Sequence, residues 1–109
     1  MKIKKFLLVL IFSFSFNTQT SFADEAKMTK GLEIFNETAG CAACHVLKAA
    51  GSEGNIGPNL DTVEGLNYNS VMDIVTHGLG VMPAFGEDEI LTKEEIDIVS
   101  FYVSNSVSK

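Results

Sequence analysis

The feature of this chain that most constrains its fold is the pentapeptide Cys41-Ala42-Ala43-Cys44-His45. Its two thiols can each form a thioether bond to one haem, and the histidine that follows can then bind the iron. This Cys-x-x-Cys-His spacing is the attachment signature of c-type haem. The chain has two cysteines in all, so the motif uses both. The sequence therefore predicts a fold built around one haem c, covalently attached through Cys41 and Cys44.

Three other uses of the cysteines fit the sequence less well. A dithiol redox motif is expected beside a βαβ pattern, and the chain shows little strand propensity. A zinc site would have to add His77 to the motif, but the adjacent Cys44 and His45 make tetrahedral closure awkward, and the spacing matches no zinc pattern. A disulfide across two intervening residues would close a small loop and stabilise little. Haem attachment is the favoured interpretation, and the other three remain open at this point.

The N-terminal segment has the pattern of a cleaved secretory signal peptide. Three lysines precede an apolar run from Phe6 to Phe16, and Ser21-Phe22-Ala23 places small residues at the positions that signal peptidase reads. The run is shorter than the roughly 20 residues that cross a bilayer, which disfavours an uncleaved anchor. We expect a signal peptide over residues 1–23, one domain over residues 24–109, and a periplasmic protein without stable membrane insertion.

The chain is acidic, with 14 Asp and Glu against 8 basic residues and a formal net charge of −6. Loss of the three N-terminal lysines would make it more acidic still. Nucleic acids and anionic membrane surfaces are disfavoured as partners because both are bound through basic faces. The charge suits a protein steered toward a partner with a basic docking patch, although acidity can also serve solubility alone.

Three segments of the domain are predicted to be helical. Their apolar residues recur at helical spacing: Met28, Gly31, Leu32 and Phe35 in 24–36; Val71, Ile74 and Val75 in the segment that opens at 69; and Ile96, Val99, Tyr102 and Val103 in the segment that starts at Thr92. Residues 46–60 and 80–89 are predicted to be loops because Gly and Pro interrupt them. With strand propensity scattered, the sequence indicates an all-α domain.

The helix ends carry their own signals. Ser70 with Asp73, and Thr92 with Glu95, have the spacing of capping boxes. Gly78 is placed to end the middle helix as a C-cap.

The iron position opposite His45 needs a second ligand, for which the sequence offers Met28, Met72, His77 and Met82. Met28 and Met72 lie within predicted helices, where packing is the better interpretation. His77 lies at a helix end, where a protonated imidazole complements the helix dipole, although imidazole also binds haem iron. Met82 lies between two helices, after glycines that let the backbone approach a flat ligand closely. From the residues alone, Met82 and His77 both stay open.

Taken together, these segments resemble the class I cytochromes c, in particular the small bacterial monohaem type. The resemblance covers essentially the whole predicted domain and rests on four motifs in order: Cys41-x-x-Cys44-His45; Gly57-Pro58-Asn59-Leu60; Gly78-x-Gly80-x-Met82-Pro83; and Thr92-x-x-Glu95-Ile96 with Phe101-Tyr102-Val103. It implies a small cytochrome c fold of about four helices wrapped around one covalently bound haem.

The resemblance also implies roles for five cofactor-binding residues: Cys41, Cys44, His45, Pro58 and Met82. The cysteines would form the thioether links, His45 would be the proximal ligand, and Met82 would be the distal ligand. The carbonyl of Pro58 would accept a hydrogen bond from the outer ring nitrogen of His45 and so orient the ring.

Other parts of the chain either follow the family or depart from it. Gly31 and Phe35 would cross the last helix near Tyr102, which would explain a glycine inside a helix. Arg and Trp are absent, so the usual partners of the haem propionates are missing. The candidates to replace them are Tyr68, Asn59 and Lys48. The 48–56 stretch is longer than in the most compact relatives.

With histidine and methionine on opposite sides of the iron, no position is left for a substrate, so we expect an electron-transfer protein and not an enzyme. The expected function is that of a soluble periplasmic one-electron carrier, cycling between Fe(III) and Fe(II) in a respiratory or dehydrogenase-linked chain. It would act as a monomer and meet redox partner proteins through a small interface at the haem edge. The alternatives are a dedicated cytochrome c subunit of a larger oxidoreductase and a haem-based sensor of small ligands.

Overall fold

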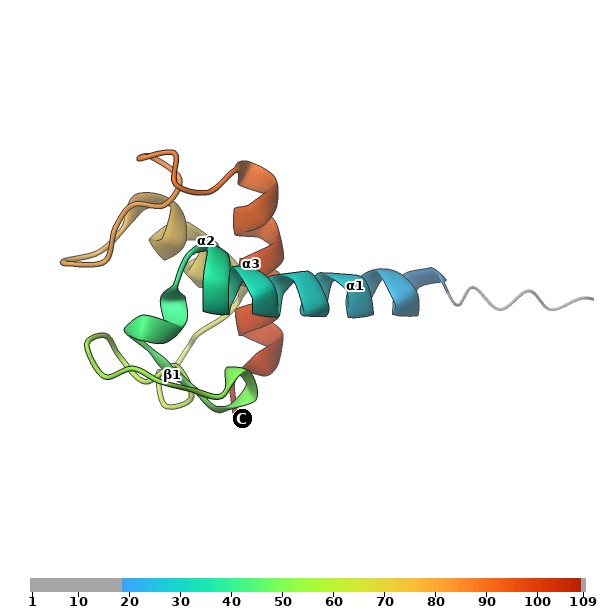
Figure 1. Cartoon of the computed structure of the whole chain (residues 1–109), viewed down its shortest axis with the longest axis horizontal. Helices are drawn as coiled ribbons and strands as arrows, with labels where there is room; N and C mark the ends of the chain where they lie inside the picture. The colour runs from blue at the N-terminus through green and yellow to red at the C-terminus, as the bar shows by residue number, and fades with distance from the viewer. Residues whose placement is uncertain (1–18, 109) are drawn as a thin grey trace, which may run out of the picture.

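The computed structural model describes residues 19–108, so residues 1–18 of the expected signal peptide lie outside the described part. Its α-helices are α1 (Gln19–Glu33), α2 (Tyr68–His77) and α3 (Lys93–Ser106) (Figure 1). The shorter elements are a π-helix η1 (Ile34–Thr38), 3₁₀ helices η2 (Cys41–Ala43) and η3 (Lys48–Ala50), and strands β1 (Val46–Leu47) and β2 (Ser52–Glu53). The expected cleavage point after Ala23 falls inside α1, and cleavage itself stays a prediction.

The main helical contact is the crossing of α1 and α3 (Figure 1). A Cβ atom on the buried Gly31 would overlap the Cβ of Tyr102 and lie 2.9 Å from its Cγ. One helical turn on, the rings of Phe35 and Tyr102 pack in a tilted arrangement with centroids 6.1 Å apart. The expected crossing at Gly31 and Phe35 is therefore present, and close backbone approach accounts for the helix-weakening glycine.

The helix ends agree with two of the three predictions. Thr92 and Glu95 form the expected capping box at the start of α3. Gly78, at φ 77°, ends α2 and donates its N–H to the carbonyl of Ile74 at 2.7 Å. The predicted box of Ser70 with Asp73 is wrong, because Asn67 is the N-cap of α2 and exchanges its capping bonds with Ser70. The helix therefore begins earlier than predicted, and Ser70 already lies within its first turn.

Two details of the predicted fold class are wrong. The described residues contain three α-helices rather than four, and β1 pairs with β2 in an antiparallel ladder of Val46 with Glu53 and Leu47 with Ser52. Gly51, at φ 69°, reverses the chain between the two strands. Further glycines and Pro58 disfavour a helix in the rest of the segment before α2. The domain is otherwise helical, as expected.

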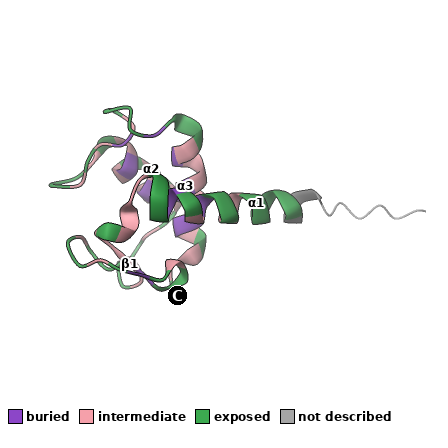
Figure 2. Ribbon diagram, viewed as in Figure 1, coloured by how far each residue is buried: buried purple, intermediate pink, exposed green. Residues whose placement is uncertain are grey.

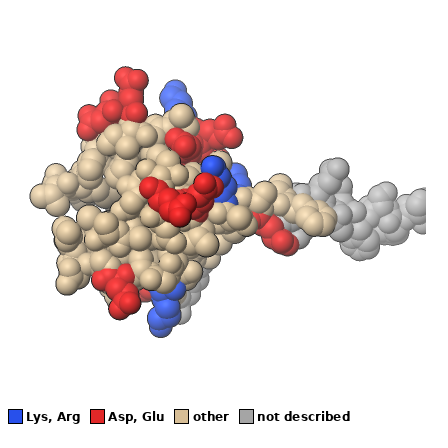
Figure 3. Space-filling model, viewed as in Figure 1, with Lys and Arg blue, Asp and Glu red and all other residues tan. Residues whose placement is uncertain are grey.

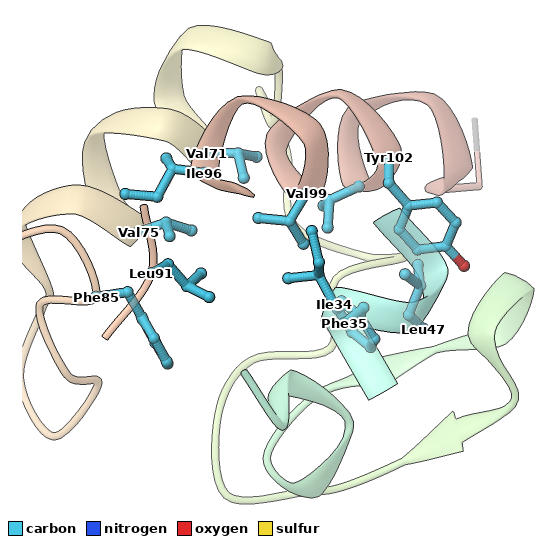
Figure 4. Close-up of a cluster of buried hydrophobic side chains, with 11 residues drawn as sticks. Ile34, Phe35, Leu47, Val71, Val75, Phe85, Leu91, Ile96, Val99 and Tyr102 are labelled. Carbon is cyan, nitrogen blue, oxygen red and sulfur yellow. The ribbon is translucent and has the colours of Figure 1, made fainter. Parts of the chain in front are cut away.

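The core is one cluster of buried apolar side chains: Ile34, Phe35, Leu47, Val71, Val75, Phe85, Leu91, Ile96, Val99, Tyr102 and Val103. Figure 4 shows Val99 of α3 between the group around Val75 and the group around Phe35. Burial is concentrated where the helices meet, whereas residues 22–26 of α1 are exposed (Figure 2). Within residues 19–108, no helix combines the length and the apolar character needed to cross a membrane.

Candidate functional site

A cavity of about 270 Å³ opens beside the core and brings most of the predicted site residues together. Cys41, Cys44, His45 and Pro58 line it on one side, and Met82 lines it from the loop after α2. The rest of its wall is apolar and includes side chains of η1, α2 and α3 such as Phe35, Val71, Val75, Val99 and Val103. The site is thus a pocket for a large apolar group, with sulfur and imidazole donors placed around it.

The cysteines are presented by a single turn of chain. Gly40, at φ 70°, leads into η2, and the N–H groups of Cys44 and His45 both donate to the carbonyl of Cys41, at 3.1 and 3.0 Å. Side chains three residues apart in such a turn lie on the same side. The turn therefore directs both thiols toward one ligand, and no disulfide joins them.

The environment of Cys41 favours a neutral sulfur. The pKa of its thiol is raised to about 11, mainly by burial, with a smaller contribution from the nearby Cys44 and against a backbone hydrogen bond that lowers it. A thiolate is the species that attacks disulfides, so the free thiol of Cys41 is a weak nucleophile at neutral pH. A thioether is uncharged and fits an apolar wall.

His45 is oriented by two contacts from the segment after β2. Its Nδ1 lies 2.7 Å from the carbonyl oxygen of Pro58, and because a carbonyl can only accept, Nδ1 carries the proton. A Cβ atom on Gly57 would lie 2.6 Å from Cε1 of the ring, so only glycine fits against the imidazole. The other ring nitrogen, Nε2, is left as the one available to a metal. The contact with Pro58 is present, and the role of His45 as proximal ligand stays a prediction.

The loop that carries Met82 is shaped by its own backbone. Leu79 and Met82 exchange main-chain hydrogen bonds of 3.2 and 3.0 Å around Gly80, whose φ is 61°. Gly78 has φ 77° and ψ 170°, a combination that is essentially limited to glycine. A Cβ there would also lie 2.7 Å from the carbonyl oxygen of Met82. The glycines predicted to let this loop approach a ligand are thus required by its conformation.

The other candidates for the second iron ligand lie elsewhere. Met28 and Met72 are partly buried against the core cluster and do not line the cavity. His77 is exposed, with Nδ1 2.6 Å from Oε2 of Glu87 and Nε2 3.7 Å from Oδ1 of Asp73. The hydrogen bond to Glu87 is the main cause of the raised pKa of His77. Among the four candidates, Met82 alone lines the cavity, and His77 is engaged at the surface.

The zinc alternative is not supported by this geometry. Over residues 19–108, no group of three or more His, Cys, Asp and Glu side chains is arranged to hold a metal ion. The histidine that a zinc site would need is paired with Glu87 outside the cavity.

The candidate partners of the haem propionates are not among the residues that line the cavity. The hydroxyl of Tyr68 donates to Asp97 on α3. The side-chain oxygen of Asn59 accepts from the N–H of Asp61, and the carboxylate of Asp61 accepts from the N–H of Lys48. These bonds do not involve the ammonium group of Lys48 or the amide N–H groups of Asn59, and the partners of the propionates stay a prediction.

One part of the site was missed by the sequence reasoning. Ile56, Leu60, Val63 and Leu66 line the cavity from the segment between β2 and α2, of which the sequence predicts only a loop as far as residue 60. Apolar residues recur there every three or four positions, and that spacing is the signal that could have identified them as a wall.

Comparisons with known proteins agree with the geometry. A family model described as cytochrome C oxidase, cbb3-type, subunit III, matches residues 26–103. A cytochrome c6 from Gloeothece citriformis is 32% identical over 108 residues, which cover 94% of this chain and 90% of the relative. The crystal structure of the c-type cytochrome SorU from Sinorhizobium meliloti superposes with a TM-score of 0.69 at 45% identity, covering 78% of this chain and 95% of that one.

Proposed function

The chain belongs to the small class I c-type cytochromes, and from this premise we propose that it is a soluble periplasmic carrier of single electrons. Members of this family are electron-transfer proteins with covalently bound haem c. The observation that carries the proposal is the convergence of Cys41, Cys44, His45 and Met82 on one apolar cavity. The haem supplies an iron centre that gains and loses one electron, and the residues determine how it is held.

The proposed roles follow from the contacts. Cys41 and Cys44 would attach the haem, His45 would bind the iron through Nε2, and Met82 would bind from the opposite side. Pro58 keeps the proton of His45 on Nδ1. The apolar wall would keep water from a haem held there and would favour its less charged state. With His45 and Met82 as ligands in both oxidation states, the haem would supply one-electron chemistry with little rearrangement of the protein.

The rim of the cavity is the proposed docking surface. Ile56, Val63, Leu79 and Val81 line the cavity and are also exposed, and Val81 is 88% exposed. In Figure 1 the loops before Pro58 and after α2 project on the same side of the molecule, and Figure 3 shows uncharged atoms along that margin with acidic groups above and below. This arrangement supports a partner with an apolar contact area and basic residues around it. Such an interface would be small and would release the partner quickly.

A second candidate is a dedicated subunit of a larger oxidoreductase. The matching family is described as a subunit of an oxidase, and an exposed apolar rim also suits a permanent interface. Purification of the protein from its native membranes and periplasm distinguishes the two. A carrier elutes alone from the periplasmic fraction, whereas a subunit elutes with its partners in fixed proportion.

The test of the proposed ligands is the absorption spectrum of the exported holoprotein with and without Met82. The wild type should be low-spin and should show the weak far-red band of ferric haem bound by a thioether. Met82→Ala should keep the covalent haem, lose that band and lower the reduction potential, because a thioether raises it. Met72→Ala is the matched control, since Met72 packs against the core outside the cavity. An unchanged band and potential in Met82→Ala would show that another residue binds the iron.

A further inference from the structure

Among the described residues, the buried polar ones are Ser52 and Ser100. Their hydroxyl groups differ in hydrogen bonding. The hydroxyl of Ser100 has no hydrogen-bond partner. That of Ser52 accepts from the N–H of Leu47 at 2.9 Å and donates to the carbonyl of His45 at 2.8 Å. A hydroxyl has one proton to donate, and of the two carbonyl oxygens within reach, that of His45 at 2.8 Å is much nearer than that of Leu47 at 3.4 Å.

The short hairpin is what brings this hydroxyl to the haem motif. Ser52 lies opposite Leu47 in the ladder of β1 and β2, and the turn at Gly51 sets that register. The residue is 7% exposed. The bond from Ser52 to His45 therefore lies in a protected place, where an unpaired polar group is costly.

The chain that follows Ser52 continues along the motif. A Cβ on Gly54 would lie 2.6 Å from the carbonyl group of Ala43 and 2.7 Å from the carbonyl oxygen of Ala42. The N–H of Gly57 donates to the carbonyl of Cys44 at 2.7 Å. Residues 52–58 thus contact the motif at each position from Ala42 to His45.

We propose that Ser52 is a positioning residue for the proximal ligand, a role that rests on the proposed function of His45. Pro58 fixes the ring of His45 through Nδ1, and Ser52 fixes its main chain through the carbonyl oxygen. With both ends fixed, the imidazole plane has one orientation relative to the cavity. The proposal also gives the longer 48–56 stretch a role, since this stretch carries the hydroxyl that binds the carbonyl of His45.

Loss of the hydroxyl would have a local effect on His45. In Ser52→Ala, the N–H of Leu47 and the carbonyl of His45 both lose their partner, so the peptide after His45 can rotate. The orientation of the imidazole plane, together with that of the thioether, sets the pattern of paramagnetically shifted proton resonances in ferric low-spin haem proteins. A less defined orientation should therefore change or broaden those resonances.

The experiment compares Ser52→Ala with Ser100→Ala in the ferric holoprotein by proton NMR. Ser100→Ala removes a hydroxyl that is also buried and makes no hydrogen bond. We expect displaced or broadened His45 and haem resonances in Ser52→Ala alone, with exchange of the Leu47 amide proton accelerated about tenfold. Ser52→Cys, which keeps a weak donor of similar size, should show a smaller change of the same kind and serves if the alanine variant does not fold.

The outcomes separate this inference from the function on which it rests. A wild-type spectrum without low-spin, histidine-bound haem would overturn the proposed function and the role of Ser52 with it. The other outcome is a low-spin wild type whose resonance pattern is unchanged in Ser52→Ala and Ser52→Cys, while both variants are less stable to heat. That outcome would leave the proposed function intact and show that Ser52 has a structural role only.

Discussion

The two sides of the cavity present their donors in different ways. On the side of residues 41–58, called the proximal side here after the proposed role of His45, this residue is fixed by uncharged groups: a carbonyl, a buried hydroxyl and the flat surface of a glycine. On the distal side, the loop of residues 78–86 is exposed around Met82. Main-chain bonds from Phe85 to Val75 and from Gly86 to Thr76 close its base, next to the ion pair of His77 with Glu87.

This difference indicates which side can change. Segments with buried, paired backbone open rarely, whereas exposed loops with few packed side chains open at low cost in free energy. The proximal side should therefore keep its geometry over a wide range of conditions. The distal loop should respond first to substitution and to pH, so variants on the two sides should give different spectra.

The largest effect is expected from the cysteines. Replacement of both Cys41 and Cys44 by Ala should abolish stable holoprotein, because neither thioether bond can form and the small domain loses the group that completes its core. Haem staining of the denatured protein and the yield from export measure this. Covalently bound haem in the double variant would contradict the assignment, while Met82→Ala should retain its haem and so mark the distal side as dispensable for attachment.

The next effect is expected at Gly57, on the proximal side. A Cβ there would lie 2.6 Å from the ring of His45, and the ring cannot retreat without losing its bond to Pro58. Gly57→Ala should lower the free energy of unfolding by about 1–3 kcal/mol, as overpacking in a core does. Denaturant unfolding, followed by haem absorbance, measures it. Gly31→Ala is the control, because it crowds Tyr102 at the helix crossing and should destabilise without displacing His45 resonances.

Compared with Gly57→Ala, Gly78→Ala should have a smaller effect on the free energy of unfolding and a larger one on the far-red band. Backbone strain of this kind costs about 1–3 kcal/mol where the chain cannot move, but an exposed loop can release it by opening. The variant should therefore lose part of the Met82 band while its unfolding midpoint shifts less than that of Gly57→Ala. Gly65→Ala is the matched control, with φ 74° and open space around the added methyl group. If Gly78→Ala and Gly65→Ala had far-red bands of equal intensity, the idea that the loop opens to relieve strain would be wrong.

The sequence predicted the parts of this site that short motifs encode. Cys41, Cys44 and His45 are adjacent in the chain, so spacing alone indicates their common ligand. Pro58 and Met82 needed the family resemblance, because nothing local shows that two distant loops meet at one cavity. The axial roles of His45 and Met82 stay predictions.

What the sequence did not reveal depends on contacts between distant segments. The hydroxyl of Ser52 matters because β2 pairs with β1, and two-residue strands are too short to give a period-two pattern. The choice between Met82 and His77 was open for a similar reason. It needed the ion pair of His77 with Glu87, ten positions away, which places the imidazole at the surface.

The smallest expected effect is the pH dependence of the distal loop, which Glu87→Gln should reduce. The hydrogen bond to Glu87 raises the pKa of His77 above its usual value, and Asp73 adds to this. A raised pKa means that protonated His77 stabilises the folded state below its ordinary pKa of about 6.5. That contribution is lost as pH rises through the raised value.

In the wild type, the far-red band should therefore weaken across this interval as the base of the loop loosens, before the proximal resonances of His45 change. Glu87→Gln should shift the transition to lower pH and reduce its amplitude. Asp73→Asn should have a smaller effect, because the carboxylate of Asp73 lies 3.7 Å from Nε2 of His77, whereas that of Glu87 lies 2.6 Å from Nδ1. A titration of the band from about pH 5 to 9 in the three proteins measures this. If wild type and Glu87→Gln titrate together, the ion pair has no part in holding Met82, and the distal loop depends on its backbone bonds alone.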